Sequence, residues 1–128
     1  MTRVYYFSRT GDSKKIAASI AAQTGGSVFP IRDGQNWAGP VGFVRGGYYA
    51  SAKKTLPADY EKPQPDDQIY LCFPLWAGSF PPAVRSFVNE VGRARIIAVP
   101  SSISSHFTDP DGFARVIEVI GADKTVRV

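Results

Sequence analysis

The sequence of 128 residues predicts an α/β domain in which helices cover both faces of a parallel sheet. Short apolar runs alternate with longer segments of helical periodicity, and glycine or proline separates most of them. Such alternation is typical of βαβ units, and right-handed crossovers between them give a doubly wound sheet, here with five expected strands. The length suits a single domain spanning residues 1–128, with enough chain to bury a core.

The first half of the chain is expected to supply two strands and two helices. Residues 4–7, Val-Tyr-Tyr-Phe, predict the first strand, and residues 28–31 predict a shorter second one. Between them, residues 13–24 place apolar side chains on one helical face, and the glycine pair beginning at Gly25 ends that helix. A second helix is expected over residues 41–54, in a segment rich in glycine and aromatic residues.

A proline-rich surface loop at residues 58–67 leads into the second half of the chain. Residues 69–73 are apolar throughout, as in a strand that is buried on both faces. The next helix is expected to begin at the Pro81-Pro82 pair, because proline suits a first helical turn, and to end at Gly92. Its apolar residues recur at intervals of three and four positions, which predicts one buried face.

The last part of the chain is expected to contain a strand at residues 96–99, a helix, and a fifth strand at residues 125–128. Asp109 is a candidate N-cap for this helix, and Pro110 suits its first position. The apolar residues that follow recur with helical spacing as far as Gly121. These features together predict four helices for the whole chain.

Composition limits the classes of function. Cys72 is the only cysteine, which excludes an internal disulfide, and its apolar neighbours predict a buried thiol. No apolar stretch approaches the ~18 residues that span a bilayer, so we expect no membrane partner and, by elimination, a cytoplasmic location. The net charge is +4, but its positive charges are scattered. This distribution disfavours nucleic acid as a partner and suits a phosphate-bearing cofactor or an acidic protein.

The loop after the first strand has the composition of an anion site. Residues 8–13 read Ser-Arg-Thr-Gly-Asp-Ser and lead directly into the first expected helix. Hydroxyl groups, a glycine and the positive end of a helix dipole all favour a bound anion. The spacing matches neither GxxxxGK[ST] nor GxGxxG, so a monophosphate fits better than a pyrophosphate. The alternative is an ordinary capped turn, since Ser, Thr and Asp are common capping residues.

Two further loops are expected at the same edge of the sheet, where doubly wound proteins bind ligands. In the loop after the third strand, Trp76 offers a stacking plane, and Gly78 lets backbone amides approach a polar ring edge. Alternatively, Trp76 only covers the core. The loop at residues 101–107 contains His106, the only histidine, which could titrate near a ligand or be incidental.

These motifs resemble those of the flavodoxin-like FMN-binding proteins. Residues 8–13 resemble the flavodoxin phosphate loop, [ST]-x-T-G-x-[ST], and residues 73–78, followed by Pro81, Pro82, Val84 and Phe87, are similar to the loop beside the isoalloxazine ring. The resemblance covers essentially the whole chain and implies the strand order 2-1-3-4-5 with non-covalently bound FMN. It implies a phosphate held by Ser8, Thr10, Gly11 and Ser13, and a ring flanked by residues 75–78.

The candidate cofactor-binding residues are Ser8, Arg9, Thr10, Gly11, Asp12, Ser13, Pro74, Leu75, Trp76, Ala77, Gly78, Ser101, Ser102, Ile103 and His106. No metal site and no catalytic side chain is predicted, because the flavin itself carries the chemistry. Asp12 departs from the pattern of the family, since an anion beside a phosphate is unfavourable. We expect it to cap the helix and point away, with Arg9 offsetting its charge. Ile103-Ser104 departs from the Thr-Ser-Gly-Gly of many relatives.

The resemblance also implies a fifth helix after the fifth strand, where this sequence reaches Val128. Without that helix, apolar surface over strands three and four would lie exposed, which predicts a homodimer or another partner at this face. Alternatively, the fifth strand and the tail fold differently, or the chain is truncated.

Three functions remain open from the sequence. The first is an electron carrier with a redox partner protein, and the second is a reductase that passes electrons from NAD(P)H to a quinone or another small-molecule acceptor. The third is a binding module with weak or no FMN affinity. Carrier flavodoxins are typically acidic, so a charge of +4 favours a two-electron role. The small size and the lack of a second nucleotide motif favour a carrier.

Overall fold

A single parallel sheet organises the computed structural model, which describes residues 1–128. Its strands are β1 (Thr2–Tyr6), β2 (Ser27–Pro30), β3 (Gln68–Pro74), β4 (Ile96–Ser102), β5 (Arg115–Val116) and β6 (Val119–Ile120). The order is β2-β1-β3-β4-β5, with β6 also paired to β4, and every pairing is parallel. The predicted fold class and strand order are therefore confirmed.

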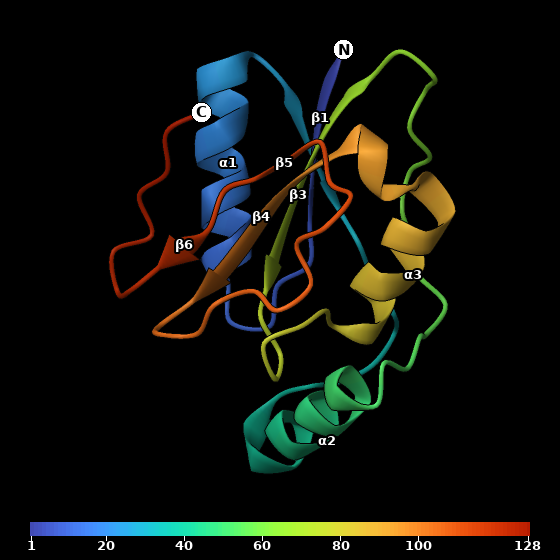
Figure 1. Ribbon diagram of the computed structural model, residues 1–128, viewed down its shortest axis with the longest axis vertical. Helices are drawn as coiled ribbons and strands as arrows, with labels where there is room; N and C mark the ends of the chain where they lie inside the picture. Colours follow the sequence, from blue (N-terminus) through green and yellow to red (C-terminus); the bar gives the residue numbers. More distant parts are fainter.

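Three α-helices connect these strands: α1 (Asp12–Thr24), α2 (Gly39–Ser51) and α3 (Pro82–Val91), with a short 3₁₀ turn η1 (Arg93–Arg95) before β4. α1 ends as predicted at Gly25, whose left-handed φ of 72° lets its N–H bond to the carbonyl of Ala21. α1 and α3 lie on opposite sides of the sheet, and α2 lies beyond the carboxyl ends of the strands (Figure 1). None of these helices is long and apolar enough to cross a membrane.

The residues of β3 alternate between two buried clusters, one on each face of the sheet. Ile69, Leu71 and Phe73 pack with α3, and Tyr70 and Cys72 pack with α1. This alternation confirms that the apolar run is a strand buried on both faces. Burial raises the pKa of the Cys72 thiol, as expected for a structural cysteine.

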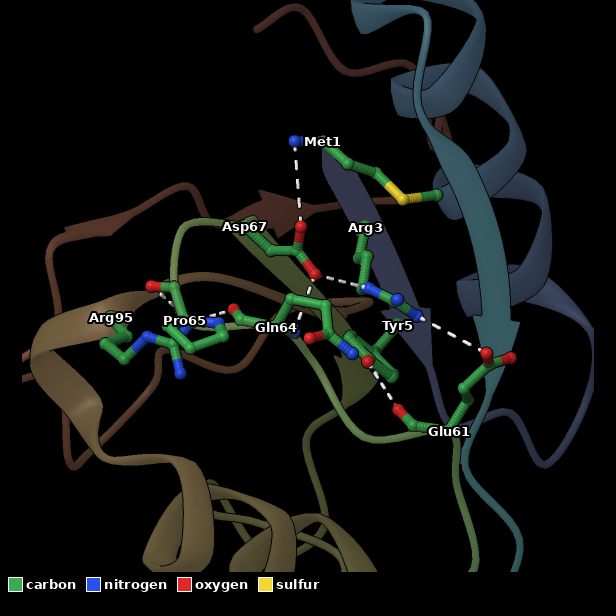
Figure 2. A network of polar contacts seen from close by, with 8 residues as sticks. All are labelled: Met1, Arg3, Tyr5, Glu61, Gln64, Pro65, Asp67 and Arg95. Carbon is green, nitrogen blue, oxygen red and sulfur yellow. Dashed lines mark hydrogen bonds and ion pairs between the residues drawn. The ribbon is translucent and has the colours of Figure 1, made fainter.

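A buried ion pair holds the strands together at their amino ends. The Arg3 Nε donates to Asp67 Oδ2 at 2.5 Å, and both side chains are almost fully buried. Asp67 also accepts the N–H of Gln64 and lies 3.6 Å from the amino terminus (Figure 2). The Tyr5 hydroxyl donates to the Glu61 carbonyl. The network fastens the loop before β3 to β1, at the edge of the sheet opposite the predicted ligand loops.

The predicted helix at residues 109–120 is wrong, because these residues form a turn followed by β5 and β6. Asp109 does not cap a helix: its carboxylate accepts two hydrogen bonds from the Arg93 guanidinium, at 2.7 and 3.0 Å. Val116 packs on the α3 face, whereas Ile117 and Val119 pack on the α1 face. Side chains that alternate between faces belong to a strand, and β-branched residues favour one.

The predicted fifth strand at residues 125–128 is wrong as well, because β5 and β6 occupy that position in the sheet. The terminal segment lies beside α1 instead: Gln23 donates to the carbonyl of Val126 at 2.8 Å and accepts the N–H of Val128 at 3.0 Å. Val126 is buried with Val99 in the cluster on the α1 face.

The face over β3 and β4, which was expected to lie exposed, is thus covered without a fifth helix. The physical reason given for a homodimer through this face no longer holds, and self-association stays a prediction without that support.

Candidate functional site

The three predicted loops meet in a cavity at the carboxyl edge of the sheet. Its volume is ≈ 380 Å³, within the range of small-molecule sites. The predicted residues that line it are Ser8, Arg9, Thr10, Asp12, Ser13, Pro74, Leu75, Trp76, Ala77, Ser101, Ser102 and Ile103. The loop after β3 is joined to the end of β4 by a hydrogen bond of 2.9 Å from the Leu75 N–H to the Ser101 carbonyl.

The corner of the cavity at α1 presents unpaired hydrogen-bond donors. Ser13 is buried, yet its Oγ has no hydrogen-bond partner in the protein. The amides of the first helical turn have no intrahelical acceptor, and Gly11, which precedes α1 at the N-cap position, has no side chain to cap them. The ordinary capped turn considered from the sequence is therefore not what forms. A buried hydroxyl without a partner costs free energy, which an anion bound here would offset.

Gly11 gives the loop its shape rather than lining the cavity. Its φ is 98°, a left-handed value, and its N–H donates to the Ser8 hydroxyl at 2.7 Å. This bond folds the loop tightly back on itself before α1. A residue with a Cβ would be strained at this angle, so glycine is required for the turn itself.

Arg9 does not offset the charge of Asp12, contrary to the hypothesis from the sequence. Its Nε donates to the Trp37 carbonyl at 2.8 Å and its Nη2 to the Gly39 carbonyl at 3.1 Å. Arg9 therefore fastens the loop after β1 to the start of α2. Asp12 is the first residue of α1, forms no ion pair and lines the cavity instead of pointing away.

Trp76 packs in the core and also lines the cavity. Its ring packs edge-on against Trp37 and Phe7, with centroid distances of 5.0 and 5.6 Å, and only 9% of the residue is exposed. The same residue lines the cavity. Trp76 thus forms a rigid wall shared with the core, not a free stacking plane.

The turn after Trp76 is tight and strained. Trp76 and Ser79 exchange two backbone hydrogen bonds of 3.0 Å, and the residues between them, Ala77 and Gly78, have φ values of 51° and 74°. A left-handed conformation is unusual for alanine. Gly78 lies outside the cavity lining, and its carbonyl accepts the N–H and the hydroxyl of Thr108. The turn is thereby held against the loop after β4.

His106 lies outside the site. Its side chain is 80% exposed, and Nδ1 lies 3.1 Å from Glu118 Oε2. It is absent from the cavity lining, and its ligand contact stays a prediction.

Sequence reasoning missed the contribution of α2, which lines the cavity with Gly42, Phe43, Gly46 and Gly47. Gly46 lies against the Trp76 ring, where a Cβ would come within 2.9 Å of Cε3. Phe43 and Ile103 give the cavity two exposed apolar side chains. The signal in the sequence was the pair of glycines four residues apart, a spacing that places both on one helix face.

Three solved structures are similar to this chain over most of their length. A flavoprotein from Lactobacillus acidophilus NCFM in complex with FMN superposes with a TM-score of 0.72 and 17% identity, over 93% of this chain and 91% of its own. A chain described as a flavoprotein from Bacteroides uniformis ATCC 8492 superposes with a TM-score of 0.72 and 21% identity, over 96% of this chain and 92% of its own. Another, from Bacteroides eggerthii DSM 20697, has a TM-score of 0.60 and 17% identity, over 98% of this chain and 89% of its own. This chain has a flavodoxin-like fold.

No family model matches the sequence, and no curated protein matches it. The likeness therefore lies in the fold, and the flavodoxin-like arrangement explains where the cavity forms. The chain leaves β1 towards α1 on one face and leaves β3 towards α3 on the other. The two connections diverge at neighbouring strands, which opens a crevice at the carboxyl edge.

Proposed function

We propose that this protein binds one FMN non-covalently and acts as an electron-transfer protein. The observation that carries the proposal is the buried Ser13 Oγ, which has no protein partner and lies at the amino end of α1 in a cavity with an apolar side. The similar structure from Lactobacillus acidophilus, which contains FMN, supports the same assignment.

The residues present fit the two halves of this cofactor. Ser13 Oγ and the first-turn amides of α1 would hold the phosphate, because they are donors at the positive end of a helix dipole. Phe43, Leu75 and Ile103 would exclude water from the ring. The N–H of Ala77 donates to no group of the chain and is available to a polar ring edge.

Bound FMN would supply the electron transfer itself, and the protein would hold it and set its surroundings. Arg9 and Asp12 are the only charged side chains in the lining, and His106 lies outside it. Both of these charged residues belong to the loop after β1 and the start of α1, where the phosphate is expected, and the apolar residues Phe43, Leu75 and Ile103 supply no acid or base. This arrangement favours electron transfer with a protein over a reaction that requires a positioned proton donor.

The proposal is tested by titrating FMN into the purified protein and then adding NADPH without any partner protein. We expect one-to-one binding with perturbed flavin absorbance, and flavin reduction by NADPH no faster than that of free FMN. Rapid NADPH oxidation with a quinone as acceptor would favour the small-molecule reductase instead. Absence of binding at high micromolar FMN would favour the third function, a binding module without flavin.

A further inference from the structure

The large apolar side chains of α2 face solvent, whereas a helix that only packs on a core buries them. Its buried face consists of small residues, Gly42, Gly46 and Ala50. Val41, Val44 and Tyr48 follow at intervals of three and four residues on the solvent side, and they are 74%, 68% and 61% exposed. A surface helix normally shows the reverse pattern, so an exposed apolar face of this kind indicates an interaction site.

This α2 apolar face, made up of Val41, Val44 and Tyr48, adjoins the mouth of the cavity. Phe43, on the same helix, is 70% exposed and lines the cavity, as does Ile103 with 68% exposure. α2 lies beyond the carboxyl ends of the strands, with its buried face against the loop after β3 and its other side open to solvent (Figure 1). Whatever covers the face would therefore also approach the cavity.

The charged residues on α2 and directly after it are all cations, and one carboxylate from another segment, Asp109, lies near Lys53. Residues 34–58 contain Arg45, Lys53 and Lys54 and no aspartate or glutamate. None of the three cations forms an ion pair with a carboxylate of the chain. The Lys54 Nζ instead lies 5.8 Å from the centre of the Tyr48 ring, so a positive charge borders the apolar face directly.

We propose that the α2 apolar face and its three cations dock an acidic electron-transfer protein, whose contact surface is apolar at its centre and ringed by carboxylates. A second copy of this chain fits poorly, because its α2 segment brings no carboxylate to pair with these cations. Opposite charges speed association and orient it. The inference rests on the proposed function: one electron would leave the reduced partner, which is oxidised, and enter the FMN, which is reduced.

The experiment uses a plant-type [2Fe–2S] ferredoxin as an acidic one-electron donor. Photochemically reduced ferredoxin is mixed with FMN-loaded protein, and flavin reduction is followed by absorbance. We expect the second-order rate to fall steeply as salt rises. Lys53→Glu/Lys54→Glu lowers it about tenfold or more at low salt, because favourable steering becomes repulsion. Val41→Ser/Val44→Ser lowers it at every salt concentration.

Arg115→Glu/Arg127→Glu is the matched control. Both residues are exposed and lie on β5 and in the terminal segment, away from α2, and the change in net charge is the same. We expect this control to keep the rate within about twofold of the wild type, since screened charges beyond a Debye length contribute little. An equal loss in the control and in the α2 variants would overturn the proposal, because net charge alone would then explain the effect.

A second measurement does not depend on the flavin. ¹⁵N-labelled protein without FMN is titrated with oxidised ferredoxin, and we expect the amide signals of residues 41–54 to shift or broaden selectively. If FMN fails to bind, the proposed function fails, yet this titration still decides the docking surface. Unchanged signals would overturn the inference. Binding of the protein through α2 to phosphatidylglycerol vesicles but not to ferredoxin would overturn it in favour of a membrane. A dimer that Val41→Ser/Val44→Ser abolishes would overturn it in favour of a second copy of this chain.

Discussion

Gly46 of α2 lies so close to Trp76 that a Cβ at this position would come within 2.9 Å of the indole Cε3. This contact sets the distance between α2 and the loop after β3, and so the width of the cavity on that side. Trp76 cannot retreat easily, because its ring is packed edge-on against Trp37 and Phe7.

Gly46→Ala is therefore expected to destabilise the protein. Overpacking a rigid contact of this kind costs about 1–3 kcal/mol of unfolding free energy. The neighbouring Gly47 offers a matched control, because a Cβ there would meet no atom from outside its own helix within 4 Å. Gly47→Ala should raise the unfolding free energy by up to about 1 kcal/mol, because alanine favours the helix. Urea unfolding measures both, and equal effects of the two substitutions would show that the Trp76 contact does not constrain α2.

Ala77→Gly is expected to stabilise the turn after β3. Ala77 has a φ of 51°, where an L side chain is strained and glycine is not. Relief of this strain should raise the unfolding free energy by about 0.5–1 kcal/mol after the greater flexibility of unfolded glycine is subtracted. Ala83→Gly, a substitution of the same chemistry inside α3, should lower it. A loss of stability in both variants would show that the Ala77 backbone is not strained.

Asp67→Asn is expected to lower stability at neutral pH and to change its dependence on pH. The N–H of Gln64, followed by the Arg3 guanidinium, lowers the pKa of Asp67 below its usual 3.8. A carboxyl with a depressed native pKa contributes stability above the unfolded pKa, and this contribution is lost as the pH falls through the native value. The difference between wild type and variant should thus be full at pH 7 and shrink below about pH 4.

Urea unfolding at several pH values checks the Asp67 prediction. Asp66→Asn, one residue earlier in an exposed position, is the control and should leave the curve nearly unchanged. A constant difference between Asp67→Asn and the wild type from pH 7 to pH 3 would contradict the role assigned to the ion pair.

Local sequence patterns correctly predicted the elements whose burial or end point is determined by their own residues. The continuous apolar run at 69–73 requires two buried faces, and Gly25 ends α1 with the left-handed angle that glycine favours. The loop after β1, read from its own residues as an anion site, brings Ser13 to the cavity lining. In each case the decisive information lies within a few residues of the chain.

Failures arose where a distant residue decided the outcome. Asp109 has the composition of a helix cap, but Arg93 binds its carboxylate, and pairing with β4 draws the following residues into the sheet. Arg9 turns to the carbonyls at the start of α2 rather than to Asp12. The role of α2 in the cavity depends on packing against Trp76: the spacing of Gly42 and Gly46 indicates a small-residue helix face but does not identify its partner.

The most direct test of the central claim compares FMN with riboflavin, which lacks the phosphate, in wild type and in Ser13→Ala. Removing a hydrogen bond to a charged group should weaken FMN binding about tenfold or more. Riboflavin affinity should stay unchanged, because Ser13 would contact only the phosphate. Equal losses for both ligands, or no loss for either, would contradict a phosphate site at the amino end of α1.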